Sequence, residues 1–137
     1  MKPIDSDEPE KAAFDSEARI IHQGDIFWIR SDNPEEANLG FYPHPYVVVQ
    51  ENLFNHSRIH SVVVCALTTN LKQANAPGNV LLEVGEANLP KQSVVVVSKV
   101  SAVNKSQLGE QIGSLSEPRI QQILAGMRLL QNSFFNR

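Results

Sequence analysis

Short runs of β-branched residues, separated by polar turns, occupy the middle of the chain. Five runs predict strands, at residues 24–30, 46–50, 61–67, 79–84 and 93–100, and residues 51–55 predict one helical turn. Short strands divided by turns such as Ala76-Pro77-Gly78 are typical of antiparallel sheets. The pattern therefore predicts a small, mostly antiparallel barrel or sandwich.

The pattern changes near the C-terminus. Apolar residues recur every three or four positions from Ile120 to Leu130, with polar residues between them. Ser116 is the expected N-cap, and Pro118 suits the first helical turn, where its missing N–H has no partner. We expect a helix over 117–131 that packs one face on the sheet. Three further apolar residues are candidates for a subunit contact or a frayed tail: Leu129, Phe134 and Phe135.

Length and charge suggest one domain preceded by a leader. The 137 residues suffice for one modest core. Residues 1–18 carry six acidic and two basic side chains, a charge of −4, whereas the whole chain has −3. We interpret them as an acidic, disordered leader, with an arm covering a basic groove as the alternative, and 19–137 as the barrel domain. Without a signal segment or an 18-residue apolar run, we expect a cytoplasmic protein with no membrane partner.

The residues favour no metal or cofactor. Cys65 is the only cysteine, which excludes an internal disulfide and a cysteine-pair zinc site. It lies in the apolar run 62–66, so we expect a buried, inert thiol, with a reactive thiol as the alternative. The chain has no glycine-rich phosphate loop, helical histidine pair or serine elbow. Asp25 follows a glycine at a strand entry and reads as a turn residue.

A few polar residues stand at expected strand ends. His44 lies between two prolines, so we expect it outside a ladder and pointing out near a loop mouth; a surface or packing histidine is the alternative. Thr68, Thr69 and Asn70 follow an apolar strand and either bind a phosphate or base edge or cap the turn. Lys99 either neutralises a phosphate or is a solvated edge lysine.

Four segments, in this order, resemble the MazF/PemK family of toxin endoribonucleases. They are Gly24–Trp28, His44–Val49, Val62–Asn70 and Leu89–Val95, followed by Ile112–Ser116 before the last helix. The similarity covers roughly residues 23–130. It implies a mainly β fold with a C-terminal helix (α+β), a small SH3-like antiparallel barrel that forms a homodimer. It also implies metal-independent cleavage of single-stranded RNA and a cognate antitoxin as partner, with DNA contacted through that antitoxin.

The resemblance also assigns roles to residues. The family's catalytic arginine falls on His44 and its catalytic threonine on Thr68. A histidine, with an ordinary pKa of about 6.5, suits proton transfer near neutral pH, and a lysine such as Lys99 supplies the positive charge that the arginine would have provided. The expected substrate-binding residues are Asn70, Thr69, Ser98, Lys99, Lys72 and Arg58. We expect the loops at 31–43 and 70–78 to set the cleaved sequence.

Two functions stay open. The first is a sequence-selective endoribonuclease of a toxin–antitoxin pair, which cuts RNA by attack of the ribose 2′-OH. The second is a catalytically degenerate toxin-fold protein that, like CcdB, binds a protein partner without cleaving RNA. Loss of the arginine and of the family's acidic residue at Ser98 favours the second. The order of the motifs favours the first, which is our prediction.

Overall fold

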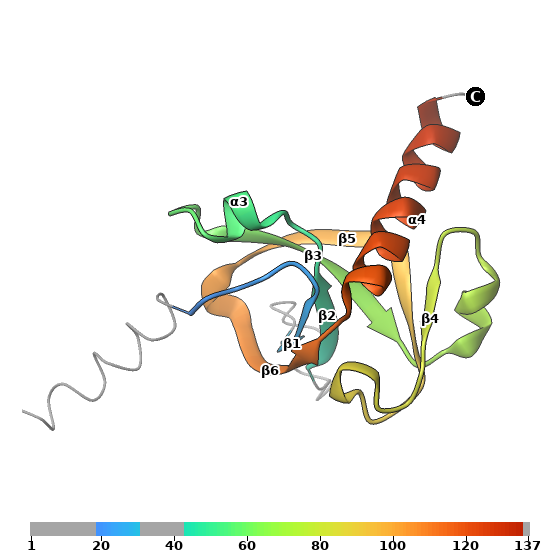
Figure 1. The fold of residues 1–137 in the computed structure, drawn as a ribbon, viewed down its shortest axis with the longest axis horizontal. Coiled ribbons are helices and arrows are strands. Elements are labelled where there is room, and N and C mark those ends of the chain that lie inside the picture. Colours follow the sequence, from blue (N-terminus) through green and yellow to red (C-terminus); the bar gives the residue numbers. More distant parts are fainter. Residues whose placement is uncertain (1–18, 31–42, 136–137) are drawn as a thin grey trace, which may run out of the picture.

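The computed structural model describes residues 19–30 and 43–135, the side chains of the last three excepted (Figure 1). Its strands are β1 (Asp25–Ile29), β2 (His44–Val48), β3 (Ser61–Thr68), β4 (Val80–Leu82), β5 (Ser93–Asn104) and β6 (Leu108–Ser114). The α-helices are α3 (Asn52–Asn55) and α4 (Glu117–Phe135), and the short 3₁₀ helices are η1 (Leu71–Asn75), η2 (Glu86–Asn88) and η3 (Lys105–Gln107). The predicted leader 1–18 and the loop 31–42 lie outside the described residues.

The six strands form one antiparallel sheet in the order β4-β5-β3-β2-β1-β6. The predicted antiparallel, mainly β fold with a C-terminal helix is therefore confirmed. The strand β6 was not predicted. It contains Gly109 and Gly113 among polar residues and lacks the alternation that marks a strand, but it pairs with β1 from Asp25 opposite Ser114 to Ile29 opposite Leu108.

The sheet is barrel-like without a ladder between its edge strands β4 and β6. Instead η2, in the segment after β4, packs against β6. The Asn88 side-chain amide donates to the Ile112 carbonyl over 3.1 Å. A Cβ at Gly113 would overlap the Ala87 carbonyl oxygen, so the glycine permits this close approach. A short helical turn thus bridges the two edges of the sheet.

The long strand β5 contains a bulge, which divides it into a buried first part and a mostly exposed second part. It places Val95 opposite Leu67 but Val100 opposite Cys65, so four residues of β5 face one residue of β3. Before the bulge the strand is buried, and after it the strand is mostly exposed. The strand continues to Asn104, four residues beyond the predicted end, because its second half pairs with the first half of β3.

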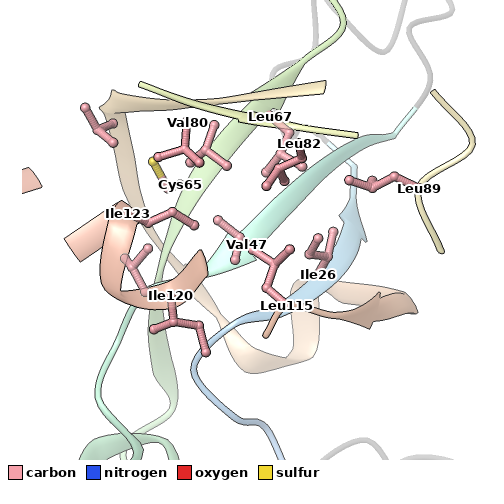
Figure 2. Close-up of a cluster of buried hydrophobic side chains, with 13 residues drawn as sticks. Ile26, Val47, Cys65, Leu67, Val80, Leu82, Leu89, Leu115, Ile120 and Ile123 are labelled. Atoms are coloured by element: carbon pink, nitrogen blue, oxygen red, sulfur yellow. The ribbon is translucent and has the colours of Figure 1, made fainter. Parts of the chain in front are cut away.

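Two clusters of buried side chains hold the sheet. The first lies under α4, which contributes Ile120 and Ile123 against Val47 and Cys65 (Figure 2). The second lies on the other face of β1, β2 and β3 and contains Ile21, Phe27, Ile29, Val48, Val62, Val64 and Leu108. Alternate residues of a strand face opposite sides, so β2 supplies Val47 to one cluster and Val48 to the other.

The helix α4 begins at Glu117, as predicted, and runs four residues beyond the predicted end. The expected N-cap is confirmed, since the Arg119 N–H donates to Ser116 Oγ over 3.4 Å. The Arg119 guanidinium also makes a bidentate ion pair with Glu86, at 2.6 and 3.1 Å. Burial acts to raise the pKa of the Glu86 carboxyl, but hydrogen bonds from Arg119 and Glu83 and the Arg119 charge lower it. This pair joins the η2 bridge to α4.

Toward its C-terminal end, α4 extends away from the sheet (Figure 1). Leu129 and Leu130 are exposed on this part. The side chains of Phe134 and Phe135, also candidates for a subunit contact, lie outside the described residues. No helix in the described parts of the chain is long and apolar enough to cross a membrane.

Candidate active site at one end of the sheet

The two residues predicted to be catalytic lie at the same end of neighbouring strands. His44 is the first residue of β2, and Thr68 is the last residue of β3. The β2–β3 ladder places Tyr46 opposite Ala66. Continuing that register by two residues along each strand brings His44 level with Thr68 on one face, where opposed Cβ atoms lie about 5 Å apart. Extended in this way, the register places an exposed imidazole and a half-buried hydroxyl at the same end of the sheet.

His44 itself joins the sheet, which corrects the expectation that its flanking prolines keep it out of a ladder. It stands opposite Ile29 of β1, and the next residue, Pro45, stands opposite Trp28. A proline lacks only its own N–H, so its neighbours can still pair with an adjoining strand. The expected outward position holds, because the His44 side chain is exposed. The expected loop before it lies outside the described residues except for Pro43.

Thr68 also takes part in a turn. The Asn70 N–H donates to Thr68 Oγ1 over 3.1 Å, and the Lys72 N–H donates to Asn70 Oδ1 over 3.2 Å. Both side chains thus cap the turn that leads into η1, which was the alternative left open by the sequence. The bond to Thr68 uses an acceptor lone pair, so the hydroxyl proton remains available for a bound oxygen.

Most of the predicted substrate-binding residues lie on the segments next to Thr68. Thr69, Asn70 and Lys72 follow it directly and are exposed. Ser98 and Lys99 are exposed on β5, in the bulge opposite Ala66. Because β5 neighbours β3, Lys99 places a cation on the strand beside Thr68.

Arg58 does not belong to this group, which corrects its assignment to the same site. It precedes β3, whereas Thr68 ends that strand, and a strand of eight residues spans about 25 Å. Arg58 instead lines a separate cleft together with His60 and Lys105.

A pocket of about 470 Å³ beside Pro43 was not predicted. Its lining residues are Trp28, Arg30, Pro43, Gln107, Gly109 and Glu110. Trp28 and Arg30 alternate with Ile29, so they face the opposite side of β1 from the residue that pairs with His44. An indole face beside a guanidinium suits stacking of a flat base. The only sequence signal was Trp28, the single tryptophan of the chain, in the first predicted strand.

Two other titratable groups have structural roles, as predicted. The buried carboxylate of Asp25 accepts hydrogen bonds from the His22 N–H (2.9 Å) and Ser114 Oγ (2.7 Å). The Cys65 thiol is buried and donates to the Val96 carbonyl over 3.0 Å. Burial raises the pKa of this thiol to about 11, so it stays protonated at neutral pH. In residues 19–30 and 43–135, no three His, Cys, Asp or Glu side chains gather to hold a metal ion.

Comparison with known proteins identifies the family of this chain. A sequence profile of the PemK-like, MazF-like toxins of type II toxin–antitoxin systems matches residues 22–130. Endoribonuclease MazF2 of Mycobacterium bovis and endoribonuclease MazF6 of Mycobacterium tuberculosis are each 30% identical over 109 residues, covering 80% of this chain and 95% of the relative. The chain belongs to this family. For this MazF-like toxin, the predicted resemblance to the MazF/PemK family is therefore confirmed.

Solved structures share the fold of this MazF-like toxin. A mycobacterial endoribonuclease in complex with its cognate antitoxin matches with a TM-score of 0.63 and 19% identity, over 80% of this chain and 92% of that chain. The Mycobacterium tuberculosis toxin MazF-mt6 matches with a TM-score of 0.62 and 17% identity, over 82% and 96%. A MazE–MazF complex from Deinococcus radiodurans gives 0.63 and 16%, over 82% and 95%. These matches establish the fold of the barrel.

Proposed function

We propose that this MazF-like toxin is an endoribonuclease that cleaves single-stranded RNA without a metal ion. Its 30% identical relatives are named endoribonucleases, which supports the reaction class. Structural neighbours include toxins solved with their antitoxins, which supports a cognate antitoxin as partner. The proposal extends to DNA, contacted through that antitoxin. The proposal places the protein in the cytoplasm, where mRNA is found, and as a homodimer.

The position of His44 beside Thr68 carries the proposal. In the reaction His44 accepts the proton of a ribose 2′-OH, and the 2′-oxygen attacks the adjacent phosphorus. The bond from phosphorus to the 5′-oxygen breaks, and that oxygen takes up a proton from water. The products are a 2′,3′-cyclic phosphate and a 5′-hydroxyl. The Thr68 hydroxyl donates to a phosphorane oxygen and the Lys99 ammonium balances its charge.

The test is RNA cleavage in excess EDTA by the full-length protein. We expect 2′,3′-cyclic phosphate ends, and we expect His44→Ala to lower kcat about 100-fold or more, the usual contribution of a positioned acid or base. Thr68→Val keeps the shape but removes the hydroxyl and should also lower kcat, whereas Thr68→Ser should retain most activity. Exposed His56, at the other end of the sheet, provides the matched control, and His56→Ala should cleave like the parent.

Three results would contradict the proposal. Full activity of His44→Ala would remove the assigned base. RNA left intact by the parent across a wide pH range would favour the other function, a degenerate toxin-fold protein that binds a protein partner. Loss of activity in EDTA, restored by added Mg²⁺, would contradict the metal-independent reaction.

A further inference from the structure

A basic cleft lies at the end of the sheet opposite His44 and Thr68. It has a volume of about 710 Å³ and is lined by Ser57, Arg58, Ile59, His60, Asn104, Lys105 and Ser106. Residues 57–60 lead into β3, and residues 104–106 comprise the last residue of β5 and the start of η3. The two segments are joined by a hydrogen bond, because the Lys105 N–H donates to the His60 carbonyl over 2.7 Å. Figure 1 shows α3 beside this end of the molecule, away from β4.

The charges in the cleft are of one sign. Arg58 and Lys105 are permanently cationic near neutral pH, and no described acidic residue lines the cleft, although the whole chain has a net charge of −3. The nearest acidic residues in sequence are Glu110, four positions after Ser106, and Glu51, six positions before Ser57, and neither of them lines the cleft. Within the described parts of the chain, Arg58 makes no ion pair, so its guanidinium is available to an anion.

Lys105 is held in place without being neutralised. Its Nζ donates to the Asn55 carbonyl over 3.0 Å and to the Ser57 carbonyl over 3.3 Å. An ammonium group has three N–H bonds, so one remains for a ligand. Asn55 is itself buried and fixed, because its amide donates to the Gln50 carbonyl over 2.7 Å and to Asn52 Oδ1 over 3.1 Å. A cation fixed before binding loses little freedom when a ligand arrives.

We infer that this cleft binds the phosphate backbone of an RNA strand at a point remote from the cleaved bond. The inference rests on the proposed function, which supplies RNA as the ligand. Arginine and lysine with neighbouring hydroxyl and amide groups are typical phosphate-binding residues, and the lining contains no Phe, Tyr or Trp, the His60 imidazole being its only ring. The cleft therefore holds RNA by its backbone, independent of sequence, and anchors long substrates.

The test compares a short and a long RNA, both 2′-O-methylated so that they bind without being cleaved. Arg58→Gln should weaken binding of a 20-nucleotide RNA about five- to tenfold and leave binding of a 6-nucleotide RNA within twofold. Loss of one phosphate contact should also make the slope of log K against log salt shallower by about 0.7. The control Arg128→Gln removes an exposed arginine on α4, outside the cleft, and should change neither. Arg58 is chosen over Lys105 because Lys105 also holds two carbonyls.

The outcomes separate this inference from the nuclease proposal. Equal binding of the long RNA by Arg58→Gln and Arg128→Gln would overturn the inference, and so would an equal loss for the short and long RNA, because that result places the contact at the reaction site. A parent that binds as expected but cuts no unmethylated RNA would overturn the nuclease proposal alone. Thermal unfolding of each variant shows that the fold is retained.

Discussion

At the scale of single residues, position 44 decides the chemistry of the reaction site. The resemblance to MazF/PemK toxins places a permanently charged guanidinium there, and this chain has an imidazole that can accept or donate a proton. The cation for the phosphate must then come from another residue. Lys99 is exposed on β5, which neighbours the strand that ends at Thr68. In the proposed reaction, proton transfer and charge balance therefore fall to two different residues.

Cys65 predicts how stability depends on alkaline pH. The folded thiol has its pKa raised to about 11, whereas an unfolded thiol titrates near its ordinary value of 9.0. Between these values the unfolded chain binds fewer protons, so the free energy of unfolding falls as pH rises, by roughly 3 kcal/mol in total for this group. Urea denaturation at pH 8 and 10.5 measures the fall.

The control for this prediction is Cys65→Ala. The variant leaves a small cavity and should be less stable at pH 8, by about 1 kcal/mol. It lacks the thiol, so its stability should fall less than that of the parent between the two pH values. Parallel declines in parent and variant would contradict the role assigned to Cys65.

At the same scale, the sequence showed which residues are buried or lie at strand ends better than it showed where they lie relative to one another. The apolar run around Cys65 predicted its burial, and the motif order placed His44 and Thr68 at strand ends. The hydrogen bond from Asn70 to Thr68 was only one of two open alternatives, because a hydroxyl at a strand end serves a turn or a ligand equally well. Arg58 was misplaced, although the predicted strand 61–67 already separates it from Thr68 along the chain.

At the scale of elements, regular patterns were predicted and irregular ones were missed. The apolar periodicity predicted α4, the N-cap Ser116 predicted its start, and the β-branched runs predicted five strands. The strand β6 was missed because its two glycines allow close approach of neighbouring backbones rather than side-chain packing. The bulge in β5 left no sequence signal, because Val94–Val97 reads as one continuous buried strand in either case.

The crossing of α4 over the segment before β4 gives a prediction for Gly126. In most helices alanine is more stable than glycine by about 1 kcal/mol. Here a Cβ at position 126 would overlap the carbonyl oxygen of Gly78, whose own φ is +87°. We expect Gly126→Ala to lower the free energy of unfolding by about 2 kcal/mol, as overpacking does elsewhere.

Chemical denaturation checks this value. Gln131→Ala, on the exposed face of the same helix, should change the free energy of unfolding by less than about 0.5 kcal/mol. A more stable Gly126→Ala protein would mean that α4 does not press on Gly78 in solution.

At the scale of the whole molecule, the sheet carries opposite features at its two ends. One end holds His44, Thr68 and the turn that follows, and the other holds the basic cleft around Arg58. The η2 bridge and the Arg119–Glu86 ion pair fix α4 against the edge of the barrel between them. A rigid scaffold with functional groups at its loop ends is a common solution among binding proteins and enzymes.

The predicted boundary at residue 19 is tested by truncation. Residues 1–18 are acidic and poor in apolar side chains, so we expect them to add little to the core. A chain of residues 19–137 should unfold within about 2 °C of the full-length protein in a thermal melt, since less than about 0.5 kcal/mol is at stake. A much lower midpoint would show that the leader belongs to the folded domain.

The position of the reacting pair on the outermost residues of β2 and β3 has a consequence for heat. Strand termini open more readily than the middle of a sheet, where Val47 and Cys65 are locked beneath α4. We expect warming to separate these two strand ends before α4 and the rest of the barrel unfold. With the proposed pair as the reaction site, cleavage should be lost some degrees below the melting temperature and should return on cooling.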